Sequence, residues 1–100
     1  MDDDGTVVGV GDVAAQARRC VENMIIVLAE AGAELTDVVG TRVLVASPRR
    51  EDLVAAWQGV RHVFGKHDAP STLLGVTVLG YESQLVEIEA VAAVLDREVR

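Results

Sequence analysis

Two carboxylates on one predicted strand are the residues of this sequence best suited to do chemistry. Glu87 and Glu89 are two positions apart in the apolar stretch QLVEIEAVAAV, residues 84–94. Because side chains alternate along a strand, both carboxylates fall on the same face. A solvated strand face would account for them without any function. A carboxylate that is partly desolvated at an interface can instead act as a general acid or base.

The other chemically active residues have simpler structural explanations. His62 and His67 are the only histidines, and no cysteine or motif spacing completes a metal shell around them. Cys20 is the only cysteine, which excludes an internal disulfide and fits a reduced thiol on a helix of a cytoplasmic protein. The stretch GVGDVA, residues 9–14, matches G-x-G-x-x-A but lacks the rest of a dinucleotide fold. Neither a metal nor a cofactor is therefore predicted.

Composition and charge exclude several classes of partner. The formal net charge of −7 argues against nucleic acid, because binding to a phosphate backbone depends on clustered Lys and Arg. The opening MDDDGTVVGV lacks the positively charged start of a signal peptide. No segment approaches the about 20 apolar residues that span a bilayer. The sequence predicts one soluble globular domain over residues 1–100, with no membrane partner.

Apolar spacing predicts a first amphipathic helix over residues 12–31. Apolar side chains recur there every three or four positions, and Gln16 is among the polar residues assigned to the opposite side. Asp12 suits the N-cap, and Gly32 suits the left-handed position that follows a helix. Both ends of this helix are therefore marked in the sequence.

A strand and a second helix follow in the order of an α+β fold. Ser47 is the expected cap of this helix, Pro48 its first residue and Gly65 its end. Two more β-rich runs come after it. The predicted strands are residues 40–47, 71–79 and 84–94, with a stub at TVVGV, residues 6–10.

The predicted strands are apolar on both faces. In residues 71–79, Leu74, Val76 and Val78 alternate with Leu73 and Leu79, and residues 40–47 show the same pattern. Two helices with one apolar stripe each cover only one face of a sheet. We therefore expect the second face to pack against further subunits, which would place Glu87 and Glu89 at an interface.

Three segments of the chain resemble the RidA/YjgF family. They are GDVAAQARRCVENMIIVLAEAGAELTDVVGTRVLVA, FGKHDAPST and QLVEIEAVAAV, and together they extend from about Gly11 to Val94. Many members of that family hydrolyse reactive enamines and imines to ketones and ammonia. The resemblance implies a chorismate mutase-like fold, with a mixed sheet and two helices on one face. It also implies a homotrimer with clefts between subunits, and a catalytic role for Glu87 in holding the attacking water.

The sequence departs from the family pattern at two places. Catalytic members carry an arginine after FGEH that binds the substrate carboxylate, and here Ser71 or Thr72 aligns with it, depending on the end from which the residues are counted. No Arg or Lys occurs between Lys66 and Arg97. The N-terminal strand hairpin of the family is represented only by GTVVGV, as an abbreviated or truncated start.

Two functions follow as hypotheses from these residues. The first is a trimeric RidA-like protein whose cleft, lined by Glu87, Ser71 and Thr72, hydrolyses an enamine or imine other than a 2-imino acid. The second is a non-catalytic ligand-binding or scaffold trimer, which the missing arginine and hairpin favour. A ribonuclease activity, suggested by older family labels, conflicts with the acidic charge.

Overall fold

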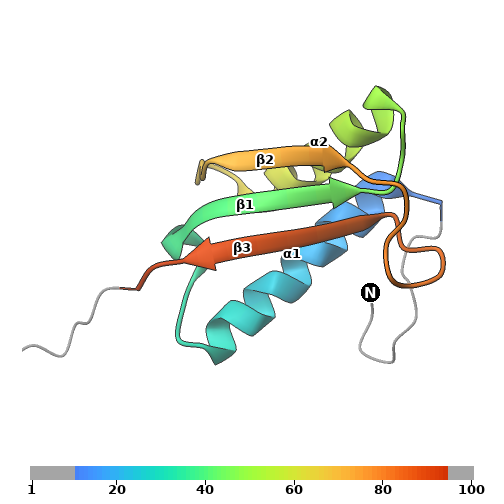
Figure 1. Cartoon of the computed structure of the whole chain (residues 1–100). Helices are drawn as coiled ribbons and strands as arrows, with labels where there is room; N and C mark the ends of the chain where they lie inside the picture. Colours follow the sequence, from blue (N-terminus) through green and yellow to red (C-terminus); the bar gives the residue numbers. More distant parts are fainter. Residues whose placement is uncertain (1–10, 95–100) are drawn as a thin grey trace, which may run out of the picture.

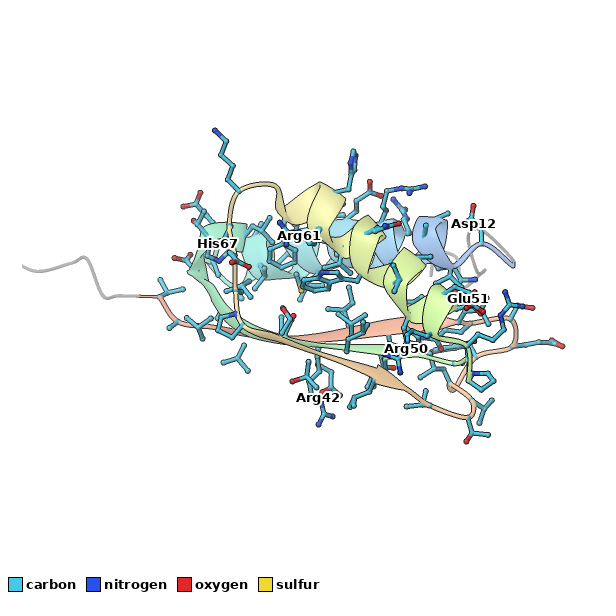
Figure 2. The ribbon with its side chains drawn as sticks, turned by 90° about the horizontal axis from the view of Figure 1, so that it is seen from above. Asp12, Arg42, Arg50, Glu51, Arg61 and His67 are labelled. Carbon is cyan, nitrogen blue, oxygen red and sulfur yellow. The ribbon has the colours of Figure 1, made fainter. Side chains whose placement is uncertain are left out.

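The computed structural model describes residues 11–94, which form two helices and a three-stranded sheet (Figure 1). Both helices lie on one side of the sheet, as Figure 2 shows from above. The predicted α+β class and the two helices on one face are confirmed. The elements are α1 (Val13–Glu30), a short 3-10 turn η1 (Leu35–Asp37), β1 (Val38–Val45), α2 (Arg50–Phe64), β2 (Ser71–Gly75) and β3 (Val86–Ala92).

The sheet is mixed, with strand order β2-β1-β3. β1 runs parallel to β2, and α2 forms the crossover between them, since a parallel pair cannot be joined by a tight turn. β3 returns antiparallel along the other side of β1. β1 is therefore the central strand, and each of its side chains has neighbours on both sides.

Helix α1 begins and ends where the sequence predicts. The Asp12 carboxylate accepts a hydrogen bond from the Ala15 amide at 3.0 Å, and Gly32 follows the helix with a φ of +82°. The prediction for Gln16 is wrong, because this side chain is buried on the sheet side of the helix. Its amide nitrogen donates to the Ser83 carbonyl at 3.0 Å, and its amide oxygen accepts from the Leu85 amide at 2.8 Å. Gln16 thus anchors the connection between β2 and β3 to α1.

Helix α2 starts two residues later than expected. Its N-cap is Arg49, so the prediction of Ser47 as cap and Pro48 as first residue is wrong. Ser47 still organises the start of the helix, because its hydroxyl donates to the Asp52 carboxylate at 2.7 Å and accepts from the Arg49 amide at 3.0 Å. Gly65 ends the helix as predicted, with a φ of +63°.

The core lies between the helices and the sheet and is built of small side chains. Its largest fully buried residues are all valines. The two helices come close where Gly59 of α2 meets α1, since a Cβ there would lie 2.7 Å from the Ala14 carbonyl oxygen. The buried cluster consists of Val13, Ala17 and Val21 from α1, Val43 and Val45 from β1, Ala56 and Val60 from α2, and Val86 from β3.

The last two strands are shorter than the sequence predicts. β2 ends at Gly75 rather than Leu79, and residues 76–79 belong to the connection that leads to β3. Leu73 and Leu74 nevertheless point to opposite faces, as predicted. The strand stub expected at residues 6–10 lies outside the described part of the chain. No helix among residues 11–94 is both long and apolar enough to cross a membrane.

Candidate functional site

A β-bulge sets which side chains of β1 face away from the helices. The pairing with β3 shifts between Val38 and Gly40, so Val39 is the extra residue. Val38 is buried, and after the bulge the buried positions are Thr41, Val43 and Val45. Arg42 and Leu44 therefore point to the other side of the sheet, which we call the open face.

The open face carries two rows of side chains in register. One row runs from Thr72 on β2 through Arg42 on β1 to Glu89 on β3. The next row runs from Leu74 through Leu44 to Glu87. The remaining open-face positions are Gly40 and Val91, which pair with each other. The face thus combines apolar side chains with an arginine on the central strand and two carboxylates on the edge strand β3.

Arg42 and Glu89 form an ion pair across the two strands. The Arg42 Nε donates to Glu89 Oε1 at 2.8 Å, and the two side chains are 55% and 50% exposed. Such an exposed pair contributes about 0–1 kcal/mol to stability. Figure 2 shows Arg42 on the side of the sheet opposite the helices. Sequence reasoning missed this residue, because its position opposite Glu89 depends on the strand pairing and the bulge.

Glu87 is on the open face but at the outer edge of the sheet, because β3 is an edge strand. It lines a hollow between β3 and α1 together with Cys20, Met24 and Gln84. Its carboxylate makes no hydrogen bond or ion pair with the described residues. Within one chain Glu87 is therefore separate from Thr72, with the width of β1 between them.

The two residues that compete for the family's arginine position lie on opposite faces. Ser71 faces the helices, where its hydroxyl is 2.6 Å from the Thr41 hydroxyl and donates to the Ala69 carbonyl at 3.0 Å. Thr72 lies on the open face beside Arg42. Arg42, Thr72 and Glu89 line one shallow hollow with Pro70, and Ser71 also reaches this hollow. Of the two, Thr72 is thus the residue that lies beside the charged groups.

Cys20 and His67 each contact a backbone carbonyl within the chain. The Cys20 thiol lies against the Val86 carbonyl, with 3.5 Å between the sulfur and the oxygen. Burial raises the pKa of Cys20, and the nearby Glu87 charge adds to this, so the reactive thiolate is disfavoured. His67 Nε2 is 2.9 Å from the Val38 carbonyl, which ties the loop after α2 to β1. Among residues 11–94, no three side chains of His, Cys, Asp or Glu gather as metal ligands would.

Comparison with protein families identifies the group to which this fold and sequence belong. The family model described as endoribonuclease L-PSP matches residues 1–94. The Rid-family protein YyfB from Yersinia pestis is 33% identical, with a TM-score of 0.81 over 93% of this chain and 71% of YyfB. The chain belongs to the RidA/YjgF family.

Two further solved structures share this fold, and the first of them also supports the family assignment. Rv2704 from Mycobacterium tuberculosis, a member of the YjgF family, is 38% identical over 83% of this chain and 69% of its own, with a TM-score of 0.69. Escherichia coli TdcF, solved with bound serine, is 24% identical over 84% of this chain and 66% of its own, with a TM-score of 0.74. Comparison with curated protein sequences gives no match.

Proposed function

We propose that this RidA/YjgF protein is a homotrimer whose clefts between subunits bind a small molecule and hydrolyse an enamine or imine. The observation that carries the proposal is the open face. It combines exposed apolar side chains, such as Leu74 and Val91 at 41% and 66% exposure, with carboxylates and a hydroxyl. A sheet face of this kind needs a cover, and further copies of the chain would supply one.

The proposed hydrolysis needs few catalytic groups. Water adds to the carbon of the C=N bond, the C–N bond then breaks, and the products are a ketone and ammonia, with no oxidant or reductant. Glu87 would hold the attacking water and take its proton, and Thr72 would donate a hydrogen bond to the substrate. The Ser71 hydroxyl, the other predicted substrate contact, already bonds within its own chain. A hydrogen bond to the substrate is therefore easier to assign to Thr72 than to Ser71.

A matched pair of lysine variants tests the trimer. Leu74 on the open face and Val54 on α2 are exposed to similar degrees, at 41% and 46%. We expect light scattering to give three times the mass of one chain for wild type and for Val54→Lys, and a lower mass for Leu74→Lys. A monomeric wild type at micromolar concentration would remove the basis for a cleft between subunits.

Turnover is tested by ammonia release from enzymatically generated imines. We expect Glu87→Gln to lower the rate by a factor of about 100 or more, as for loss of a general base. Glu30→Gln, which changes an exposed carboxylate at the end of α1, is the control and leaves the rate unchanged. No ammonia release by wild type above the uncatalysed rate would support the second hypothesis, a ligand-binding or scaffold trimer without turnover. An equal, measurable rate in wild type and Glu87→Gln would refute the role of Glu87.

The proposal also includes the sequence-based predictions on cofactors, localisation and RNA. No cofactor is needed for the hydrolysis written above. The cytoplasm is proposed as the site of action because the single cysteine fits a reduced compartment. RNA cleavage is not expected despite the family label, since the net charge of −7 opposes binding to a phosphate backbone.

A further inference from the structure

The hollow that Glu87 lines lies between helix α1 and the edge strand β3, apart from the one beside Arg42. It is open to solvent and measures about 400 Å³. Pockets that bind small molecules are of this size, about 300–1,000 Å³. Most of its lining side chains carry no polar oxygen or nitrogen, namely those of Cys20, Met24, Val27, Leu28, Ile88 and Ala90. The hollow therefore offers a largely apolar surface next to one carboxylate.

The backbone of β3 adds hydrogen-bonding groups to this hollow. The Ala46 amide donates to the Leu85 carbonyl at 2.8 Å, so these two residues form a hydrogen-bonded pair of the β1–β3 ladder. Because such pairs alternate along an antiparallel ladder, the N–H and C=O groups of Ile88 and Ala90 point away from β1. Within residues 11–94, no strand lies on that side of β3. The two N–H groups can thus donate to a ligand in the hollow.

The hollow contains no cation that could bind an anionic ligand. Of the side chains from residues 11–94 that line it, Glu87 is the only charged one. Arg42 lines the other hollow, together with Thr72 and Glu89. A ligand carboxylate between α1 and β3 would therefore be repelled by Glu87, and an uncharged ligand would not.

We infer that this hollow binds the hydrocarbon group of the substrate, and that the substrates are uncharged aliphatic imines rather than 2-imino acids. The inference rests on the proposed function, because it assigns the substrate class on which Glu87 acts. Met24 and Val27 contact the hydrocarbon group, and the Ile88 N–H donates to the imine nitrogen. The imine carbon then lies at the end of the hollow where Glu87 holds water. Substrate choice is thereby made by helix α1, which takes no part in the chemical step.

A substrate without a carboxylate also fits the departure of this sequence from the catalytic members of its family. Those members use an arginine to bind the substrate carboxylate, and here no Arg or Lys occurs between Lys66 and Arg97. An uncharged imine has no group for that arginine to bind. The same sequence can therefore lack the arginine and still hold a substrate through apolar contacts.

Titration with methyl isobutyl ketone and with 4-methyl-2-oxopentanoate tests the inference without requiring turnover. Both compounds have the same isobutyl group, and only the second has a carboxylate. We expect wild type to bind the ketone about tenfold more tightly than the oxo acid. It should also prefer the ketone about tenfold over acetone, which lacks most of the hydrocarbon group. NMR titration measures the affinities and should show the largest shifts at the amides of Val27, Ile88 and Ala90.

A matched pair of lysine variants on α1 locates the ligand. Val27 lines the hollow and Ile26 does not, and the two side chains are 62% and 56% exposed. Val27→Lys should weaken ketone binding and strengthen oxo acid binding by up to about fivefold, as for an exposed ion pair. Ile26→Lys adds the same charge outside the hollow, so it should change either affinity by less than about twofold. Circular dichroism shows whether both variants keep the fold.

Two imines with the same isobutyl group extend the test to the reaction. A flavin amine oxidase generates one from isoamylamine, and an L-amino acid oxidase generates the other from leucine, with a carboxylate attached. We expect ammonia release above the uncatalysed rate to be faster for the first. Val27→Lys should shift the ratio of the two rates toward the second.

The outcomes distinguish this inference from the proposed function. Tighter binding of the oxo acid than of the ketone by wild type, or equal effects of Val27→Lys and Ile26→Lys, would overturn the inference and leave the trimer and Glu87 untouched. No ketone binding at millimolar concentration would do the same. Ketone binding in the hollow without ammonia release would support the preference for uncharged ligands and refute the hydrolysis. Faster hydrolysis of the leucine-derived imine, lost in Glu87→Gln, would support the proposed function and refute the assignment of uncharged substrates.

Discussion

The two faces of the same sheet differ in what their side chains do. The face toward the helices is closed by valines and alanines from all the main elements except β2, and its polar groups, such as Thr41 and Ser71, bond to each other. The open face carries exposed leucine and valine, two carboxylates and one arginine. The first face can account for the fold of a single chain. The second has features that this fold does not need.

Substitutions at adjacent residues of β1 should show the largest difference between the two faces. Val43 is fully buried under the helices, and Leu44 is on the open face. We expect Val43→Asp to lower the free energy of unfolding by at least about 4 kcal/mol, because an unpaired charge is buried. Leu44→Asp should keep the circular dichroism spectrum and reduce the mass in light scattering. Equal loss of structure in both would show that the open face is as necessary for folding as the closed one.

Helix packing on the closed face gives the next largest effect. Gly59→Ala places a methyl group against the α1 backbone at Ala14, so the helices must separate. We expect a loss of about 1–3 kcal/mol from overpacking, offset by up to about 1 kcal/mol of improved helix propensity. Urea unfolding measures it, with the exposed neighbour substitution Gln58→Ala as control. Unchanged stability in Gly59→Ala would mean that the helices have room to move apart.

The Cys20 thiol on α1 predicts a pH dependence of stability. Burial raises the pKa of Cys20 above its ordinary value of 9.0, so the folded state holds this proton more tightly than the unfolded state does. The resulting stability is fully present below about pH 9 and is lost as pH rises through the folded-state pKa. Urea midpoints at pH 7 and pH 10 should therefore differ more for wild type than for Cys20→Ala. Identical differences in both would contradict the prediction.

The smallest effect on stability is expected at the charged pair of the open face. Glu89→Gln removes an exposed ion pair with Arg42, so the free energy of unfolding should change by less than about 1 kcal/mol. A stability loss well above 1 kcal/mol would mean that the pair is desolvated in the assembly.

The sequence alone was sufficient to predict the helices and strands and their order along the chain. Alternating and helical periodicity, together with Asp12, Gly32 and Gly65 as end markers, predicted both helices and the order of the strands. Gln16 was misplaced because its polarity hid its burial, which depends on two backbone partners about seventy residues away in the chain. Periodicity cannot report contacts of that kind.

The candidate site could be predicted only in part for a related reason. Glu87 and Glu89 share a strand, so their common face follows from spacing alone. Arg42 belongs to the same face through cross-strand register, and counting along the chain does not reveal it. The choice between Ser71 and Thr72 also depended on register, since neighbouring residues on a strand point to opposite faces.

The bulge at Val39 changes the alternation of side chains along the central strand. Because β1 has one more residue than β3 at this point, Val38 and Val43 share a face although they are five positions apart. If Val39 paired as an ordinary strand residue without the bulge, the chain could bury either Val38 or Thr41, Val43 and Val45, but not both sets. Any redesign of the open face around Arg42 therefore has to keep the bulge, because the bulge sets which side of the sheet each residue after it faces.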